Sequence, residues 1–226
     1  MSTGKLSALQ GRVLEALAGR LDPPWTLTGG GALVGVHLQH RETRDLDLFW
    51  HGLSELGQIP GQVIRELATA GLQAEVIRTD LAFCELRVTD GDAVVTVDLV
   101  ADPVPTIEPP QIVQFKAAKI QIDTRHEILV NKLCALFGRS ELRDLQDVHA
   151  LLEAGQDLQR AVRDAPKKDG GFSPLTLAWL LRQFPVVKLA RKLGFSELEA
   201  DDMDRTRTEL TARIVSLAAP DDDTTH

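Results

Sequence analysis

The chain has 226 residues, of which 43% are hydrophobic and 26% are charged, a balance typical of a soluble protein with a sizeable core. No apolar run is long enough for a membrane span, and the first residues lack a secretory signal, so the cytoplasm is the expected compartment. The formal net charge of −8 counts against extensive nonspecific binding to nucleic acid, so any RNA contact must rest on a local patch.

The first half of the chain alternates predicted helices and strands. Apolar periodicity predicts helices at 5–20, 32–39 and 54–71, and strands at 25–28, 45–50, 72–79, 82–88 and 93–100. Asp90-Gly91 is a hairpin signal between the last two strands. Four prolines between residues 103 and 110 then predict an extended loop.

The second half is predicted to be helical, with helices at 126–137, 141–154, 157–164, 173–193 and 196–218 and a break at 167–171. The layout predicts an α+β fold in which a small mixed sheet with helices is followed by a helical C-terminal lobe. The predicted domains are a core at 1–110, the helical lobe at 111–220 and an acidic tail at 221–226.

A glycine cluster is the first feature with chemical meaning. Gly29, Gly30 and Gly31 follow an apolar segment and precede a helix-like run. A loop without side chains at a helix N-terminus exposes backbone N–H groups to an anion such as a phosphate. Taken alone, such a cluster is more typical of an ordinary turn.

Two carboxylates follow the glycines at close range. Asp45 and Asp47 alternate with apolar residues, and in a strand they point to the same face of the sheet. Adjacent carboxylates repel each other, and a divalent cation relieves that repulsion because hard cations prefer carboxylate oxygens. An isolated pair is more often a solvated strand edge. A phosphate-binding loop beside a carboxylate pair, however, is the minimum apparatus for metal-assisted nucleotidyl transfer.

Two later segments carry polar side chains in apolar surroundings. Asp98 lies in an otherwise apolar strand and needs a partner, either a buried arginine or backbone donor, or the cation held by the first two carboxylates. Lys132 lies in an apolar helix, where a lysine usually extends to solvent. Asp144 and Asp147 are one helical turn apart, and Arg143 is expected to form either a surface ion pair or a ligand contact.

The glycine and carboxylate segment resembles the first motif of the nucleotidyltransferase superfamily that includes DNA polymerase β. More closely, it resembles the AbiEii toxin family, whose signature is Gly-Gly-Thr-Ala-Leu followed by His-Arg-x-Ser-x-Asp-Leu-Asp-Leu-Phe. The matching residues are Gly29, Gly30, Ala32, Leu33, His40, Arg41, Asp45, Leu46, Asp47, Leu48 and Phe49. Thr43 replaces the usual Ser, and Gly31 replaces the usual Thr, which removes a hydroxyl that could contact phosphate.

The resemblance also implies roles for the later residues. Asp98 matches the third carboxylate, so Asp45, Asp47 and Asp98 are the expected ligands of Mg²⁺ or Mn²⁺ and, with Lys132 and Asp147, the expected catalytic set. The lysine of the later family motif contacts the nucleotide phosphates, and its final aspartate positions the active-site base or the metal shell. The expected nucleotide-binding residues are Gly29, Gly30, Gly31, Arg41, Lys132 and Arg143.

These residues predict a metal-dependent enzyme that transfers a nucleoside monophosphate from an NTP to an acceptor hydroxyl. The resemblance implies a toxin that modifies the 3′ end of tRNA and is opposed by an antitoxin protein. One alternative is a small-molecule nucleotidyltransferase, since an acidic cleft suits a cationic aminoglycoside. Another is a nucleotide-binding regulatory module without transfer activity, for which Gly31 is the only support.

Overall fold

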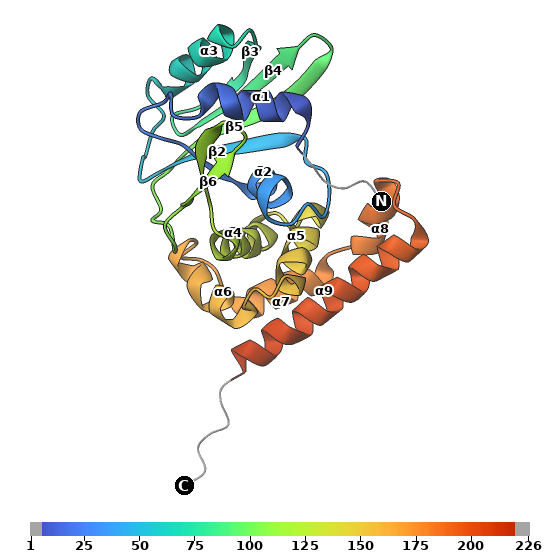
Figure 1. Cartoon of the computed structure of the whole chain (residues 1–226). Coiled ribbons are helices and arrows are strands. Elements are labelled where there is room, and N and C mark those ends of the chain that lie inside the picture. Colours follow the sequence, from blue (N-terminus) through green and yellow to red (C-terminus); the bar gives the residue numbers. More distant parts are fainter. Residues whose placement is uncertain (1–5, 220–226) are drawn as a thin grey trace. The chain divides into compact units, whose positions relative to one another are not determined.

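The computed structural model describes residues 6–219, so the predicted acidic tail lies outside the described residues (Figure 1). The chain forms two compact units, Met1–Ile128 and Leu129–His226. The first unit contains a mixed sheet with helices and the second is helical, which confirms the predicted α+β class. None of the helices in the described residues has the length and apolar character needed to cross a membrane.

The sheet of the first unit has seven strands in the order β3-β4-β5-β2-β1-β7-β6. Their bounds are β1 Thr26–Thr28, β2 Asp45–His51, β3 Gln73–Thr79, β4 Phe83–Asp90, β5 Ala93–Asp102, β6 Gln111–Phe115 and β7 Ala118–Ile122. Strand β2 runs parallel to β5, and β1 runs parallel to β7, whereas the other neighbours are antiparallel. The two parallel pairs place segments far apart in the sequence side by side at the centre of the sheet.

The two faces of the sheet differ because apolar and polar residues alternate along its central strands. On β2, Leu46, Leu48 and Trp50 are buried, whereas Asp45 and Asp47 on the other face are half-buried. Helices α1 (Ala8–Leu17) and α3 (Ile59–Thr69) pack against each other and against the sheet, as Figure 1 shows. Both helices are amphipathic and bury their apolar sides, so they account for the buried face.

Helix α1 also supports the polar end of the sheet. It begins with a capping box, in which Ser7 and Gln10 each accept a hydrogen bond from the other's backbone N–H. The Gln10 amide, which is buried, additionally donates to the backbone carbonyls of Thr43 and Asp45 at 3.2 and 3.4 Å. These bonds tie the start of β2 to α1 and hold the first carboxylate of the motif in place.

Three predicted boundaries are corrected by the structure. Residues 111–122, expected to lie in the helical lobe, form the β6–β7 hairpin, because β7 gains a parallel partner in β1 that no local pattern reveals. The division after Ile128 therefore differs from the predicted boundary at 110. The helix predicted at 32–39 begins earlier, as α2 (Gly29–Ala32), and continues as a π-helical turn, Leu33–His37. The helix predicted at 173–193 is interrupted at Pro185.

The second unit is built from helices α5 Leu142–Glu153, α6 Leu158–Asp164, α7 Pro174–Gln183, α8 Val186–Lys192 and α9 Glu197–Ala218, together with most of α4 Arg125–Gly138 and a short 3₁₀ turn at Ala165–Lys167. Asp157, Ser173 and Ser196 are N-caps whose side chains accept backbone N–H groups. Helix α9 packs along α7 and α8, and its buried residues include Leu210 and Ile214.

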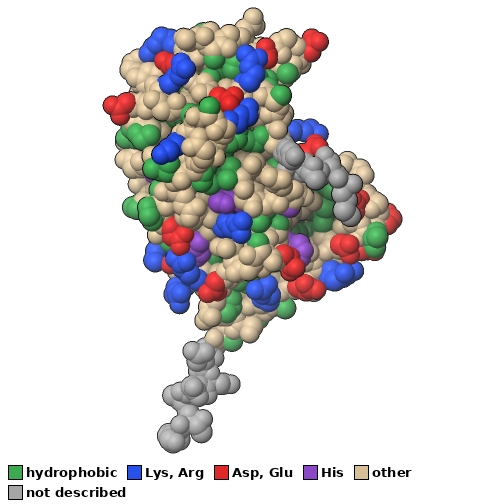
Figure 2. Space-filling model, in the orientation of Figure 1, with side chains coloured by type: hydrophobic (Ala, Val, Ile, Leu, Met, Phe, Trp, Pro, Cys, Tyr) green, Lys and Arg blue, Asp and Glu red, His purple; other side chains and the backbone are tan. Residues whose placement is uncertain are grey.

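The excess of acidic over basic residues lies mainly in the first unit. Residues 1–128 contain 17 Asp and Glu against 11 Lys and Arg, whereas residues 129–219 contain 13 against 14. On the face drawn in Figure 2, acidic and basic side chains are interspersed rather than gathered by sign. A polyanionic partner would therefore have to be recognised by a small set of cations and not by a broad basic field.

Candidate active site

The register between β2 and β5 brings two of the predicted carboxylates together. Asp47 lies opposite Asp98, and Asp45 lies opposite Thr96, so the three carboxylates share one face of the sheet. The same row continues to Thr28 on β1 and to Glu85 on β4, which lies opposite Asp98. Parallel pairing of strands distant in the sequence thus produces a carboxylate row that each strand alone only suggests.

Asp98 is the most perturbed member of this row. Its Oδ1 atom is buried and has no hydrogen-bond partner among residues 6–219. Burial, together with the nearby carboxylates Asp47, Glu85 and Asp45, raises the pKa of Asp98 to about 6 against the lowering effect of Arg78. A buried carboxylate oxygen that lacks a donor, surrounded by like charges, is the environment that a cation stabilises.

Asp45 is held by a neighbour that the sequence reading did not select. The Thr43 hydroxyl donates to Asp45 Oδ1 at 2.7 Å, and Thr43 also packs against Gly30. The Arg41 guanidinium approaches the same glycine: a Cβ added there would lie 3.1 Å from Arg41 Nη2. The motif His-Arg-x-Thr therefore folds back onto the glycines of α2, so Arg41 lies beside the predicted phosphate-binding backbone.

Gly29, the first residue of α2, permits a close approach between the start of that helix and Asp47. Its φ of +58° lies in the left-handed region, and a Cβ added there would overlap Asp47 Oδ2. Gly31 has a different environment, since its added Cβ would lie 3.1 Å from Leu27 Cδ1 and 3.2 Å from Leu46 Cδ2. A side chain at position 31 would start between apolar residues, which accounts for a glycine at a position that usually holds threonine in the family motif.

Replacement by alanine is expected to have a large effect at Gly29 and a small effect at Gly31. Gly29→Ala should lower the free energy of unfolding by about 2 kcal/mol or more and abolish transferase activity, because it adds backbone strain and displaces Asp47. Gly31→Ala should cost about 1 kcal/mol or less, because its methyl group meets only the ends of two flexible leucines. Urea unfolding and an NTP-transfer assay would compare the two variants. Equal effects would contradict the assigned role of Gly29.

The predicted residues of the second unit form a buried ion-pair network. Lys132 Nζ lies 2.9 Å from Asp144 Oδ1 and 2.8 Å from Asp147 Oδ2, and both aspartate side chains are fully buried. Arg139 donates from Nε and Nη2 to the two oxygens of Asp144 at 2.8 and 3.0 Å. Lys132 is itself 7% exposed and does not extend to solvent as an isolated helical lysine would.

The contacts in this network favour the ionised forms of Lys132 and Asp144. Burial lowers the pKa of Lys132, but the attraction of Asp147 and Asp144 outweighs it and raises the pKa. Burial likewise raises the pKa of Asp144, and the contacts with Arg139 and Lys132 more than reverse that effect. Arg143 stands apart from these buried groups. It is exposed and pairs with Glu141 at 2.7 Å, as expected of a surface ion pair.

A divalent cation fits the donor chemistry of the carboxylate row. Asp45, Asp47 and Asp98 are hard oxygen donors on one face of the sheet, and the partnerless Asp98 Oδ1 leaves one buried acceptor atom to be satisfied. Among residues 6–219, however, no three Asp, Glu, His or Cys side chains already converge as a closed set of metal ligands. The structure therefore brings Asp47 and Asp98 together and aligns Asp45 on the same face.

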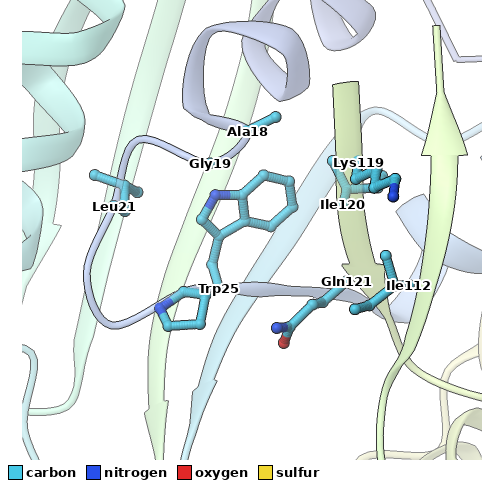
Figure 3. A pocket seen from close by; sticks show the side chains of 9 residues that line it. Ala18, Gly19, Leu21, Trp25, Ile112, Lys119, Ile120 and Gln121 are labelled. Carbon is cyan, nitrogen blue, oxygen red and sulfur yellow. The ribbon is translucent and has the colours of Figure 1, made fainter. Parts of the chain in front are cut away.

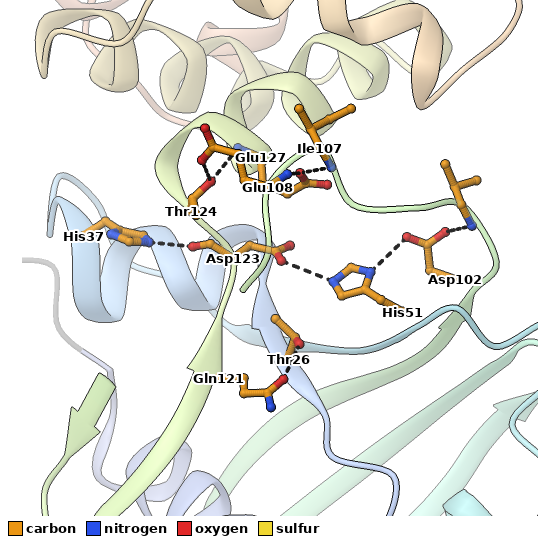
Figure 4. A network of polar contacts seen from close by, with 11 residues as sticks. Thr26, His37, His51, Asp102, Ile107, Glu108, Gln121, Asp123, Thr124 and Glu127 are labelled. Atoms are coloured by element: carbon orange, nitrogen blue, oxygen red, sulfur yellow. Dashed lines mark hydrogen bonds and ion pairs between the residues drawn. The ribbon is translucent and has the colours of Figure 1, made fainter. Parts of the chain in front are cut away.

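A second polar cluster in the first unit was not predicted (Figure 4). His51, at the end of β2, lies with Nδ1 3.3 Å from Asp102 Oδ2 and with Nε2 3.2 Å from Asp123 Oδ1. Burial lowers the pKa of His51, but these two hydrogen bonds outweigh it and raise the pKa to about 9. The cluster ties β2, β5 and the end of β7 together, and its partners come from strands that meet only in the folded sheet.

The pocket drawn in Figure 3 is separate from these residues. Its lining includes Trp25, Ile112 and Ile120, and its volume is about 220 Å³. This is below the roughly 300 Å³ at which ligand pockets usually begin. The Trp25 indole donates to the carbonyl of Leu17, the last residue of α1, at 3.1 Å. The pocket is therefore a recess beside the end of α1, lined mainly by apolar residues. No predicted site residue lines it, and the carboxylate face remains the candidate active site.

Comparison with known proteins decides which family this arrangement represents. The family model described as "Nucleotidyl transferase AbiEii toxin, Type IV TA system" matches residues 12–223, nearly the whole chain. The chain belongs to the AbiEii nucleotidyltransferase toxin family. This confirms the resemblance drawn from the motif and identifies an enzyme that transfers nucleotides. A comparison with curated proteins finds no significant match.

Solved structures support the AbiEii fold. MenT4, a nucleotidyltransferase toxin of Mycobacterium tuberculosis H37Rv, is 17% identical with a TM-score of 0.59, covering 95% of this chain and 83% of MenT4. JHP933 from Helicobacter pylori is 20% identical with a TM-score of 0.54, covering 94% and 96% of the two chains. An antigenic nucleotidyltransferase-like protein from Paracoccidioides brasiliensis is 18% identical with a TM-score of 0.50, covering 84% and 96%. The TM-scores show a shared fold.

Proposed function

We propose that this AbiEii protein transfers a nucleoside monophosphate from an NTP to the 3′ hydroxyl of tRNA in a metal-dependent reaction. The observation that carries the proposal is the pairing of Asp47 with Asp98, whose buried Oδ1 lacks a donor. A nucleotide-binding module without transfer activity has no need for this costly arrangement of carboxylates. The third carboxylate therefore favours catalysis over binding alone.

The chain's own residues supply orientation and charge. When bound by Asp45, Asp47 and Asp98, Mg²⁺ or Mn²⁺ would supply a lowered pKa for the attacking hydroxyl and charge neutralisation for the leaving pyrophosphate. Thr43 orients Asp45, and Gly29 lets the backbone at the start of α2 approach Asp47. Arg41, beside Gly30, is placed to contact a phosphate held by the same backbone.

The family resemblance assigns Lys132 to the nucleotide phosphates and Asp147 to the positioning of the active-site base or the metal shell. Asp144 and Asp147 hold the ammonium group of Lys132 in one position, which supports a fixed role for this lysine. An ammonium has three donor protons, so a third remains for a ligand after these two contacts. In this proposal Asp147 is a positioning residue, since its contact is with Lys132.

The acceptor can be tested directly. Purified protein would be incubated with Mg²⁺ and each of the four labelled NTPs, in parallel with unfractionated tRNA and with a panel of aminoglycosides. We expect label in the tRNA fraction. EDTA added before the reaction should prevent this labelling. Label transferred only to aminoglycosides would instead establish the small-molecule alternative. NTP binding that is independent of Mg²⁺, without any transfer, would favour the regulatory module.

The AbiEii family belongs to a type IV toxin–antitoxin system, which suggests an antitoxin partner. We propose that this chain is the toxin half and that its expression alone slows growth through tRNA modification. A reading frame for a small regulator immediately upstream would support this assignment. Co-expression of that regulator should restore growth.

A further inference from the structure

The row of side chains that contains Asp47 and Asp98 continues across the sheet to its exposed edge. Glu85 on β4 lies opposite Asp98, and Arg78 on the edge strand β3 lies opposite Glu85. In the next row, Arg87 on β4 lies opposite Thr96. Cross-strand partners share a face, so Arg78 and Arg87 lie on the carboxylate face of the sheet, and both are exposed.

A β-bulge turns Arg78 toward this face. Val76 pairs with Leu86 and Arg78 pairs with Glu85, so Ile77 is an extra residue in β3. Regular alternation from Val76, on the apolar face, would have placed Ile77 on the carboxylate face and Arg78 behind it. Bulges often re-aim a side chain next to an active site. The position of Arg78 is thus a product of an irregularity in the strand.

Arg78 is further ordered by an aromatic ring. Its guanidinium carbon lies 4.6 Å from the centre of the Phe83 ring. Stacking uses the flat face of a guanidinium and leaves its N–H edge free for a bidentate contact with a phosphate. Phe83 is half-buried on β4, opposite Val100, so the platform beneath Arg78 is part of the sheet.

Neither arginine is held by an ion pair among residues 6–219, whereas Arg12 and Arg20 pair with Asp90 and Glu66. Two exposed arginines without ion pairs form a local basic patch on an acidic unit. RNA binding by a protein with a net charge of −8 would depend on such a patch.

We propose that Arg78, Phe83 and Arg87, the β3–β4 surface, bind the phosphate backbone of the acceptor RNA next to its 3′ end. The proposal rests on nucleotidyl transfer at the carboxylate row and names the surface that holds the second substrate. Asp98 and Arg78 are two strand spacings apart, roughly 10 Å, at about 4.8 Å per strand. A stacked RNA strand covers that distance in about three nucleotides, at roughly 3.4 Å each.

The charge of this surface also separates acceptor classes. An RNA strand whose 3′ hydroxyl lies at Asp98 would place its preceding phosphates over the two arginines. A polycationic aminoglycoside in the same place would be repelled by them, although Glu75 and Glu85 lie in the same rows. The arginines therefore favour a polyanionic acceptor, and two contacts fit a short single-stranded end better than a long duplex.

The test compares Arg78→Ala, Arg87→Ala and the double variant with Arg65→Ala, a control on α3. Arg65 is also exposed, but its helix packs on the other side of the sheet. A 5′-labelled single-stranded RNA with a free 3′ hydroxyl is titrated by fluorescence anisotropy at several salt concentrations. Each single variant should weaken RNA binding about tenfold. The double variant should reduce the slope of log K against log salt by about 1.4.

Transfer assays separate this surface from the proposed reaction. The double variant should raise the KM for tRNA while the KM for NTP and the melting temperature stay at wild-type values. If the double variant kept the RNA affinity and the KM for tRNA of the wild type, the role proposed for the β3–β4 surface would be wrong. The proposed function would be unaffected by that result. RNA binding that depends on the arginines, in a wild-type protein that transfers no nucleotide to RNA, would support the surface and overturn the proposed function. A wild-type protein that binds no RNA would overturn the surface.

Discussion

Asp98→Asn is expected to abolish nucleotide transfer and at the same time to stabilise the folded protein. Loss of the third carboxylate should lower the rate of transfer about 10³-fold or more. A metal-organised site stabilises the transition state by several kcal/mol, and each 1.36 kcal/mol corresponds to a tenfold change in rate. The stabilisation follows from the raised pKa of Asp98, about 6 against an ordinary value of 3.8. The two effects have opposite signs because the site is built at the expense of stability.

The pH dependence has a defined sign. A carboxyl group with a raised pKa binds its proton more tightly in the folded state than in the unfolded state. The contribution of Asp98 to the free energy of unfolding is therefore most favourable below pH 3.8 and is lost as pH rises through about 6. Above that window the charged Asp98 destabilises the fold. A shift of about two units corresponds to roughly 3 kcal/mol, which we reduce to about 1 kcal/mol for partial exposure to solvent.

Chemical denaturation at pH 4 and pH 7.5, without divalent cations, would measure this effect. Asp98→Asn should be more stable than the wild type at pH 7.5, and the difference should shrink at pH 4. Adding Mg²⁺ should stabilise the wild type more than the variant. Asp92→Asn, a control in the exposed β4–β5 turn, should change neither stability nor transfer. An Asp98→Asn protein that is less stable than the wild type at pH 7.5 would contradict the account of Asp98.

Lys132→Met is expected to destabilise the protein by about 3–5 kcal/mol, because it leaves two buried carboxylates without their shared cation. Asp144 retains Arg139, whereas Asp147 loses its ion pair with Lys132. Adding Asp147→Asn to Lys132→Met should therefore recover about half of the lost stability. Such recovery would show that the cost comes from an unpaired charge and not from lost packing.

Arg143→Ala is the matched control for this network. Arg143 lies on the same helix as the two aspartates, but it is exposed and pairs with Glu141 on the surface. Its loss should change the free energy of unfolding by less than about 0.5 kcal/mol. Urea denaturation of the four proteins at pH 7.5 provides the comparison. If Lys132→Met were as mild as Arg143→Ala, the ion pairs of Lys132 would carry no net stability.

Local patterns in the sequence were sufficient for part of the site. Strand alternation places Asp45 and Asp47 on one face, and helical spacing places Asp144 and Asp147 on one side of α5. Both statements depend only on residues near one another in the chain. The apolar surroundings of Asp98 and Lys132 also singled them out, and family resemblance added their expected roles, but nothing local decided which groups they contact.

Long-range contacts account for what was missed. The β6–β7 hairpin forms beside β1, a partner about a hundred residues earlier, and its own residues carry a weak strand pattern. His51 meets Asp102 and Asp123 only after β2, β5 and β7 have joined one sheet. The orientation of Arg78 depends on a bulge whose register is defined by β4. Each of these contacts is decided by strand pairing.

The sequence by itself determined the AbiEii motif, the alternating carboxylates and the succession of a mixed sheet and helices, because short-range periodicity and residue order encode them. Only the tertiary structure decided that Asp98 completes a row with Asp47 and that Lys132 is buried between two aspartates. The physical reason is that the pKa of a carboxylate and the cost of a buried charge depend on burial and on neighbouring charges. Residues distant in the chain provide those neighbours.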